Sequence, residues 1–193
     1  MTHVILALLI WYKCAMVKGK PFMVGSMARL HMFNKRLGAK ANAIYKRSAL
    51  QAGSRNTIWN NLAQGIEMVE AFDQLKRILP ELINTKVDLY KEPLVVKTKA
   101  GKGIGAVECP RGTLYHYYEL DEAGKIIAAD MITPSAQNSA RIEEDIRVVC
   151  QSLLKEESSE SGSSILQKNL ETLIRAYDPC NTCATHMVQV RYG

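Results

Sequence analysis

The chain has 193 residues, of which 47% are hydrophobic and 23% charged, with a formal net charge of +6. This length and composition allow one globular domain with a real core. Its five cysteines are odd in number and irregularly spaced, which argues against a disulfide framework and favours a reducing compartment.

The charge is unevenly distributed along the chain. Residues 1–113 carry 18 Lys and Arg against 7 Asp and Glu, whereas residues 114–193 carry 7 against 12. From Lys13 to Arg55 there are ten basic residues and no acidic one. Such a run can bind nucleic acid or an acidic protein, or can simply be solvated. Because no RNA- or DNA-binding motif accompanies it, we expect residues 1–55 to dock another subunit and not nucleic acid.

An apolar run extends from Val4 to Tyr12. Its nine residues are about half of the roughly 20 that a membrane-spanning helix needs, and the flanks of a secretory signal are missing. We therefore expect a buried strand or short helix and no membrane span. A run that is apolar on all sides requires neighbours around it, which is typical of the interior of a larger chain.

The following segments predict helices. Pro21 to Leu30 predicts a short strand that turns at Gly25 into a helix, and residues 38–55 predict a weak helix interrupted at Gly53.

The clearest helix signal covers residues 56–79, with Ser54 as its N-cap and a break at Pro80. Its apolar residues recur at spacings of three and four: Ile58, Leu62, Ile66, Val69, Phe72, Leu75 and Leu79. Its polar residues are expected on the exposed face: Asn60, Asn61 and Glu67.

A hairpin is predicted in the second half of the chain. Residues 115–120 and 125–133 alternate in polarity, and residues 121–124 between them have turn chemistry. Pairing of these strands would bring Arg111 beside Ser135.

Two segments predict loops: the glycine-rich residues 100–105, which lack the full phosphate-loop pattern, and the polar residues 156–164. Further helices are predicted over residues 137–155 and 165–177. Together the elements predict a mainly α, α+β fold over residues 1–193, a helical bundle with a small antiparallel β-hairpin.

Two cysteines and a histidine lie close together in the stretch from Asp178 to His186. Cys180 and Cys183 are three positions apart and His186 follows after three more, so one turn of chain presents two soft ligands and one borderline ligand. Pro179 fixes φ ahead of the first thiol. The spacing alone allows half a zinc site, a redox pair or a disulfide.

The longer string RAYDPCNTCATH, residues 175–186, resembles the C-terminal signature of the large subunit of nickel–iron hydrogenases. Two upstream motifs are similar to this family in the same order, CPRG at residues 109–112 and TPSAQN at residues 133–138. Cys109 stands where the family usually has alanine. A further segment, VGSMAR at residues 24–29, is also similar, so the resemblance runs from near residue 20 to the end.

The resemblance implies a nickel–iron centre with carbon monoxide and cyanide on the iron, which cleaves dihydrogen reversibly into protons and electrons. Cys180 would be a terminal nickel ligand, and Cys183 would bridge the two metals. Arg111 would lie over the metals, where either its guanidinium or the Cys180 thiolate could accept the proton. Ser135 would donate a hydrogen bond to a cyanide.

The resemblance also implies an outer shell. Pro110, Leu114 and Pro134 would form an apolar wall around the diatomic ligands. His186 would hold a magnesium or iron ion together with the main-chain carbonyl of Met131.

The sequence also departs from the family because it has no second CxxC and Cys14 stands alone. We therefore expect the fold and the site to be incomplete without an N-terminal half that bears the other CxxC; a truncated relic is the other possibility. The implied partners also include an iron–sulfur small subunit and a maturation endopeptidase that removes residues 187–193. The implied location is the cytoplasm.

Two alternative functions remain open from the sequence. The first is a non-catalytic structural or assembly subunit of a hydrogenase-derived complex, which the intact ligands disfavour. The second is a zinc-binding interaction module, which would bind zinc and no nickel.

Overall fold

The computed structural model describes residues 6–8, 14–85, 97–153, 160–180 and 189–191. In these residues the chain forms β1 (Leu6–Leu8), α1 (Ser26–Phe33), α2 (Ala39–Lys46), α3 (Asn60–Asn84), β2 (Gly101–Cys109), β3 (Gly112–Leu120), β4 (Ile126–Ile132), α4 (Pro134–Leu153), α5 (Glu160–Tyr177) and β5 (Gln189–Arg191). This is the predicted mainly α fold with a small antiparallel sheet. Among the described helices, none combines the length and apolarity needed to cross a bilayer.

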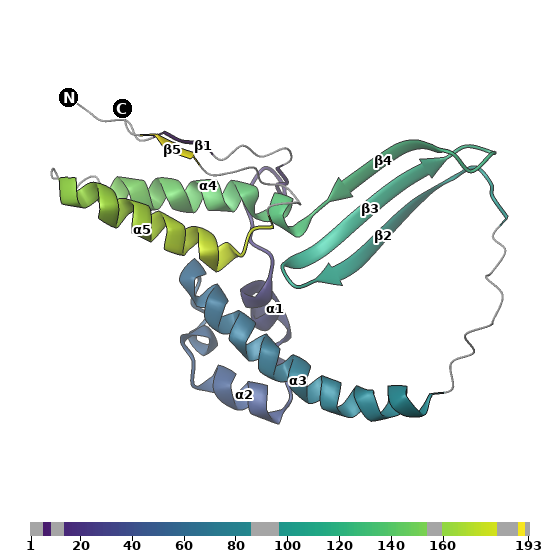
Figure 1. Ribbon diagram of the computed structural model, residues 1–193, viewed down its shortest axis with the longest axis horizontal. Helices are drawn as coiled ribbons and strands as arrows, with labels where there is room; N and C mark the ends of the chain where they lie inside the picture. Colours follow the sequence, from purple (N-terminus) through teal and green to yellow (C-terminus); the bar gives the residue numbers. More distant parts are fainter. Residues whose placement is uncertain (1–5, 9–13, 86–96, 154–159, 181–188, 192–193) are drawn as a thin grey trace.

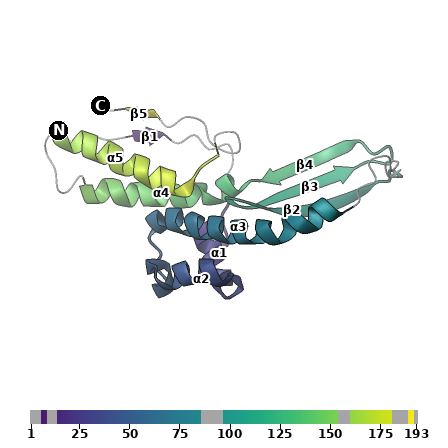
Figure 2. The same cartoon turned by 60° about the horizontal axis from the view of Figure 1, so that its bottom comes forward.

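The helices form two groups, with the sheet projecting away from both (Figure 1). In the first, α1 and α2 pack on the first half of α3; in the second, α4 and α5 lie side by side. Each group has its own buried cluster, and Met23 packs against both. Their fully enclosed side chains include Leu50 and Ile66 in the first group and Ile142 in the second. Figure 2 shows the same division from a second direction, with the second half of α3 extending beyond α1 and α2.

The sheet has the order β2-β3-β4, and all its pairs are antiparallel. The predicted hairpin is confirmed as β3 and β4, and Asp121 closes its turn by accepting hydrogen bonds from the amides of Ala123 and Lys125, both at 2.9 Å. The loop predicted over residues 100–105 is wrong from Gly101 onward, because β2 begins there. Pairing with β3 satisfies the β2 backbone on one side, which offsets the low strand propensity of its glycines.

The start of α1 differs from the prediction. No strand forms over residues 21–24; instead the Val24 amide donates to Asn138 Oδ1 at 2.8 Å, and Asn138 Nδ2 donates to the Val24 carbonyl at 3.3 Å. A side-chain amide thus takes the place of a partner strand.

The long helix α3 is shifted toward the C-terminus relative to the prediction. Asn56, and not Ser54, caps the short 3₁₀ turn that leads into it, by accepting from the Ile58 amide at 3.0 Å. The predicted break at Pro80 is wrong, since α3 continues to Asn84. Residues 74–85 are all exposed, so water can bind the carbonyl that Pro80 leaves without a donor.

The remaining predictions are confirmed over most of their length. Helix α4 starts at Pro134, three residues before the predicted start, and α5 begins at Glu160, inside the predicted loop. Residues 156–159 lie outside the described part of the chain. In the N-terminal apolar run, Leu6–Leu8 form strand β1, and residues 4–5 and 9–12 of the run lie outside the described part of the chain.

Candidate functional site

Four segments that are distant in sequence meet between the two helix groups: the start of α1, the turn between β2 and β3, the start of α4 and the chain leaving α5. Two glycines with positive φ allow this close approach. A Cβ on Gly25, at φ 116°, would lie 3.3 Å from the Arg111 carbonyl oxygen. A Cβ on Gly112, at φ 140°, would lie 2.7 Å from a Val24 methyl and 3.2 Å from Pro134 Cβ. Both positions are therefore restricted to glycine.

Arg111 is bound by the residue that follows α5. Its Nε donates to the main-chain carbonyl of Asp178, and its Nη2 donates to Asp178 Oδ1 at 3.1 Å. The Asp178 carboxylate also forms an ion pair with Nε at 3.1 Å. Asp178 has a φ of 49°, which is uncommon for a residue other than glycine. The arginine thus connects the β2–β3 turn to the backbone that leads to Cys180.

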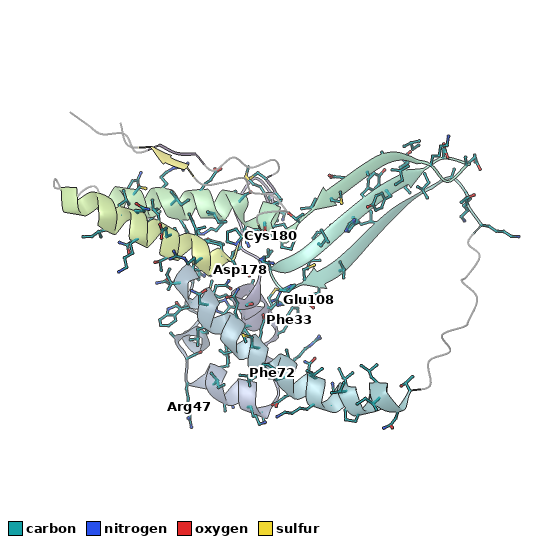
Figure 3. All side chains as sticks on the ribbon, in the orientation of Figure 1. Phe33, Arg47, Phe72, Glu108, Asp178 and Cys180 are labelled. Carbon is teal, nitrogen blue, oxygen red and sulfur yellow. The ribbon has the colours of Figure 1, made fainter. Side chains whose placement is uncertain are left out.

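Ser135 contacts the backbone of Cys180, the candidate metal ligand. This buried side chain accepts a hydrogen bond through Oγ from the Cys180 amide at 3.1 Å. The first turn of α4 is capped instead by Thr133, whose Oγ1 accepts from the Ala136 amide at 3.2 Å. Ser135 therefore holds the thiol segment against α4, and Figure 3 shows Asp178 and Cys180 at this junction.

The structure thus brings Arg111, Ser135 and Cys180 together, whereas Cys183 and His186 lie outside the described residues. Cys180 is in a disulfide, and a cysteine binds a metal only as a reduced thiolate. In the part of the chain that the structure describes, no three His, Cys, Asp or Glu side chains are grouped as metal ligands.

The residues predicted around the centre differ in exposure. Pro134 is buried and Leu114 half-buried, whereas Pro110 is exposed. Met131, on β4, is 49% exposed. The apolar wall and the carbonyl ligand therefore stay predictions.

An arginine that was not predicted as a site residue braces the turn that carries Arg111. Arg29 on α1 donates to both carboxylate oxygens of Glu67 on α3, each at 2.6 Å. The same guanidinium donates to the carbonyl of Cys109 at 3.2 Å and to that of Pro110 at 2.7 Å. Because an arginine fork has fixed geometry, it holds these two carbonyls, and the residue after them, in one position relative to α3.

Asn60 joins α1 to α5. Its Oδ1 accepts from the Met27 amide at 2.9 Å, and its Nδ2 donates to the Ala176 carbonyl at 2.7 Å. The predictions for Asn60 and Glu67 are therefore wrong, because Asn60 is buried and Glu67 is paired with Arg29; Asn61 is exposed as predicted. The sequence did contain a signal that Asn60 is buried. Asn60, Ala63 and Ile66 follow one another at intervals of three residues, and Ala63 and Ile66 face the core.

A polar cluster fixes the end of α5. Tyr177 Oη donates to Asp145 Oδ2 at 2.6 Å, the Thr57 hydroxyl donates to the same oxygen at 2.7 Å, and Arg141 pairs with Asp145 Oδ1 at 2.6 Å. Burial, and then the hydrogen bond to Asp145, raises the pKa of Tyr177 well above its usual range. Tyr177 is therefore a neutral, anchored residue directly before Asp178.

Comparison with known proteins adds to this geometry. The family model for nickel-dependent hydrogenase matches residues 9–186. The chain is 31% identical to the sulfhydrogenase 2 subunit alpha of Pyrococcus furiosus over 90% of its own length and 40% of the relative. It is 35% identical to the NAD-reducing hydrogenase HoxS subunit beta of Cupriavidus necator over 67% of its length and 26% of the relative.

The fold is also similar to a solved structure. A crystal structure of an NAD⁺-reducing [NiFe]-hydrogenase in the H₂-reduced state matches with a TM-score of 0.70 and 24% identity. The match covers 93% of this chain and 42% of that one. The chain thus spans about two-fifths of the length of the sulfhydrogenase subunit and of the solved hydrogenase chain. Because the family model covers nearly the whole of it, this chain belongs to the nickel-dependent hydrogenase family.

Proposed function

We propose that this chain provides one side of a nickel–iron hydrogen-cleaving centre, with Cys180 and Cys183 as two of its sulfur ligands. The observation that supports this most strongly is the convergence of Arg111, Ser135 and Cys180 from three separate segments. A stiff turn after α5 presents Cys180, the adjoining guanidinium is fixed by Asp178, and thiolates suit nickel and iron. The donors fit part of the group, and the other thiolates come from a second CxxC outside this sequence.

When bound, the nickel–iron group supplies the Lewis-acidic metals at which dihydrogen is split. Arg111 places its guanidinium next to the segment that carries Cys180, through its hydrogen bonds to Asp178. Asp178 holds that charge in place through the ion pair and fixes the direction of the fork. We assign the proton acceptor to the Cys180 thiolate, because a thiolate sulfur keeps a lone pair that can bind a proton.

Ser135 orients the centre. Its oxygen accepts from the Cys180 amide, so its hydroxyl proton would be available to donate to a cyanide on the iron. Pro134, buried beside Gly112, and Leu114 exclude water from the same side. As the family resemblance implies, His186 and the Met131 carbonyl would hold a magnesium or iron ion.

The remaining parts of the assembly are proposed from the family. The chain acts with an iron–sulfur small subunit that receives the electrons, and an endopeptidase removes residues 187–193 after metal insertion. The cytoplasm is the proposed location.

The test uses a chimera of the Cupriavidus necator HoxS subunit beta, made in that host, in which this chain replaces the segment that it matches. We expect the reduced, purified chimera to contain nickel and iron. Cys180→Ser should remove the nickel, and Cys150→Ser should retain it, because Cys150 lies on α4 away from the junction. Arg111→Lys should retain both metals and lose at least about tenfold of the hydrogen-oxidising activity.

Two results would contradict the proposal. One is a folded chimera without nickel, and the other is stoichiometric zinc bound to the chain, as expected for the zinc-binding alternative.

A further inference from the structure

The second half of α3 carries apolar side chains that nothing in the described part of the chain covers. Every residue from Gln74 to Thr85 is exposed. The exposed fractions are large for apolar side chains and are 60% for Met68, 60% for Phe72, 51% for Leu75, 46% for Leu79 and 60% for Leu82. Figure 3 labels Phe72 midway along this helix.

These side chains face away from the core of their own helix group. Ile66 on the same helix is fully buried against α1 and α2. At about 100° per residue, Leu75, Leu79 and Leu82 lie within about 40° of the direction opposite Ile66. The helix therefore has two apolar faces, of which only one is packed. An isolated helix of this kind is marginal in water, so its second face needs a partner.

The width of the second face indicates what kind of partner fits. Viewed down the helix axis, the exposed apolar residues span an arc of about 140°, with Ile78 at one edge, Leu79 inside it and Ile83 at the other edge. A two-helix coiled coil buries a narrow seam, whereas a helix packed on a globular body buries a stripe wider than about 100°. The width thus favours a globular body over the same helix of a second copy.

Apolar side chains on the sheet are exposed as well. The exposed fractions are 79% for Ile104 on β2, and 61% and 60% for Ile126 and Ile127 on β4. In the solved hydrogenase chain that shares this fold, the matched part is only 42% of the polypeptide. More than half of that subunit thus lies outside the matched fold, which makes it the available body of the right size.

We propose that the exposed face of α3, defined by Met68, Phe72, Leu75, Leu79 and Leu82, is the docking surface for the rest of the hydrogenase large subunit. The inference rests on the proposed function and names the surface on which the remainder of such a subunit binds. It places the main contact on α3, and not on the basic residues 1–55 that the sequence suggested. The partner presents an apolar surface, whether it belongs to the same polypeptide or to another.

The experiment compares amide hydrogen exchange in the 193-residue chain and in the HoxS beta chimera. We expect residues 74–84 to exchange rapidly in the chain alone and at least about tenfold more slowly in the chimera, while amides around Ile66 are protected in both. Leu75→Glu should abolish the added protection. Arg77→Glu, two residues away on the opposite side of α3, should keep it.

The result also separates this proposal from the proposed function. The chimera with Cys180→Ser should lose nickel and keep the protection of α3. If α3 is protected in the parent chimera but nickel is absent, the docking surface is supported and the metal site is contradicted. If nickel is present but α3 is not protected, the metal site is supported and the docking surface is contradicted.

Three outcomes overturn the inference. The first is equal exchange of residues 74–84 in the chain alone and in the folded chimera. The second is protection of residues 74–84 in the chain alone that increases with protein concentration, since this would show that the face binds a second copy of the chain. The third, which needs no chimera, is a lower unfolding midpoint of the isolated chain with Leu75→Glu than with Arg77→Glu, since that would show that the face is already packed.

Discussion

The junction between the helix groups and the second half of α3 follow opposite patterns. At the junction, polar side chains such as Asn60 and Ser135 are buried, and each is hydrogen-bonded across more than 30 residues of sequence. Along the second half of α3, apolar side chains such as Leu75 and Leu82 are exposed. Buried polar groups with complete hydrogen bonding specify one arrangement, whereas exposed apolar groups indicate a missing neighbour. The chain thus fixes the junction by its own contacts, whereas the exposed face of α3 is where we propose that another body packs.

The largest expected effect contrasts two alanine substitutions in the same helix. Ile66→Ala removes a fully buried side chain and should lower the free energy of unfolding by about 2–5 kcal/mol. Leu79→Ala, on the exposed face, should change it by less than about 0.5 kcal/mol. Urea unfolding of the isolated chain measures both, and equal losses would remove the distinction between the two faces.

A second test concerns the junction itself. Asn60→Ala leaves the Met27 amide and the Ala176 carbonyl buried without partners, which should cost about 2–3 kcal/mol. Asn61→Ala, one position further on and exposed, is the matched control and should be nearly neutral. Similar unfolding midpoints for the two variants would show that the junction does not depend on Asn60.

Tyr177→Phe should cost about 1–2 kcal/mol, because it removes the hydrogen bond to the Asp145 carboxylate. The sign of the pH dependence follows from the raised pKa of Tyr177. The stabilisation is present in full below the unfolded-state pKa of about 10 and is lost as the pH rises above it. Unfolding measured from pH 8 to 11 should therefore show a steeper alkaline loss for the parent than for the variant. Parallel curves would contradict this.

The smallest effect is expected at the brace beneath Arg111. Arg29→Lys keeps the charge but loses the fork that reaches Glu67 and the Pro110 carbonyl together, for a loss of about 1 kcal/mol. Amide exchange at Gly112 should increase at the same time, because the turn loses its support. Arg36→Lys, at an exposed arginine in the 3₁₀ turn that follows α1, should change neither quantity.

Local sequence patterns predicted the elements whose signals are local. The periodicity of α3 and the turn at Asp121 identified a helix and a hairpin. Strand β2 was missed because its glycines have low strand propensity, and only pairing with β3 makes it a strand. Pro80 was predicted to end a helix, but a proline on an exposed helix loses only a hydrogen bond that water replaces.

The candidate site was predicted only as far as its motifs extend. Arg111, Ser135 and Cys180 were found from family motifs, and the structure places them at one junction. Asp178 and Arg29 lie inside the same motifs but had no assigned partner, because their partners are 67 and 38 residues away. No local pattern contains such a distance, so these contacts could be found only from the fold.

The two ends of the chain are tied together. In β1 and β5, Leu6 pairs with Arg191 and Leu8 with Gln189, so both strands depend on the residues after position 186. If the endopeptidase removes those residues, Leu6–Leu8 loses its partner strand at the same moment. One cut near the C-terminus would then leave the backbone N–H and C=O groups of a strand near the N-terminus without a partner. Such a strand is able to pair with the edge of a neighbouring sheet.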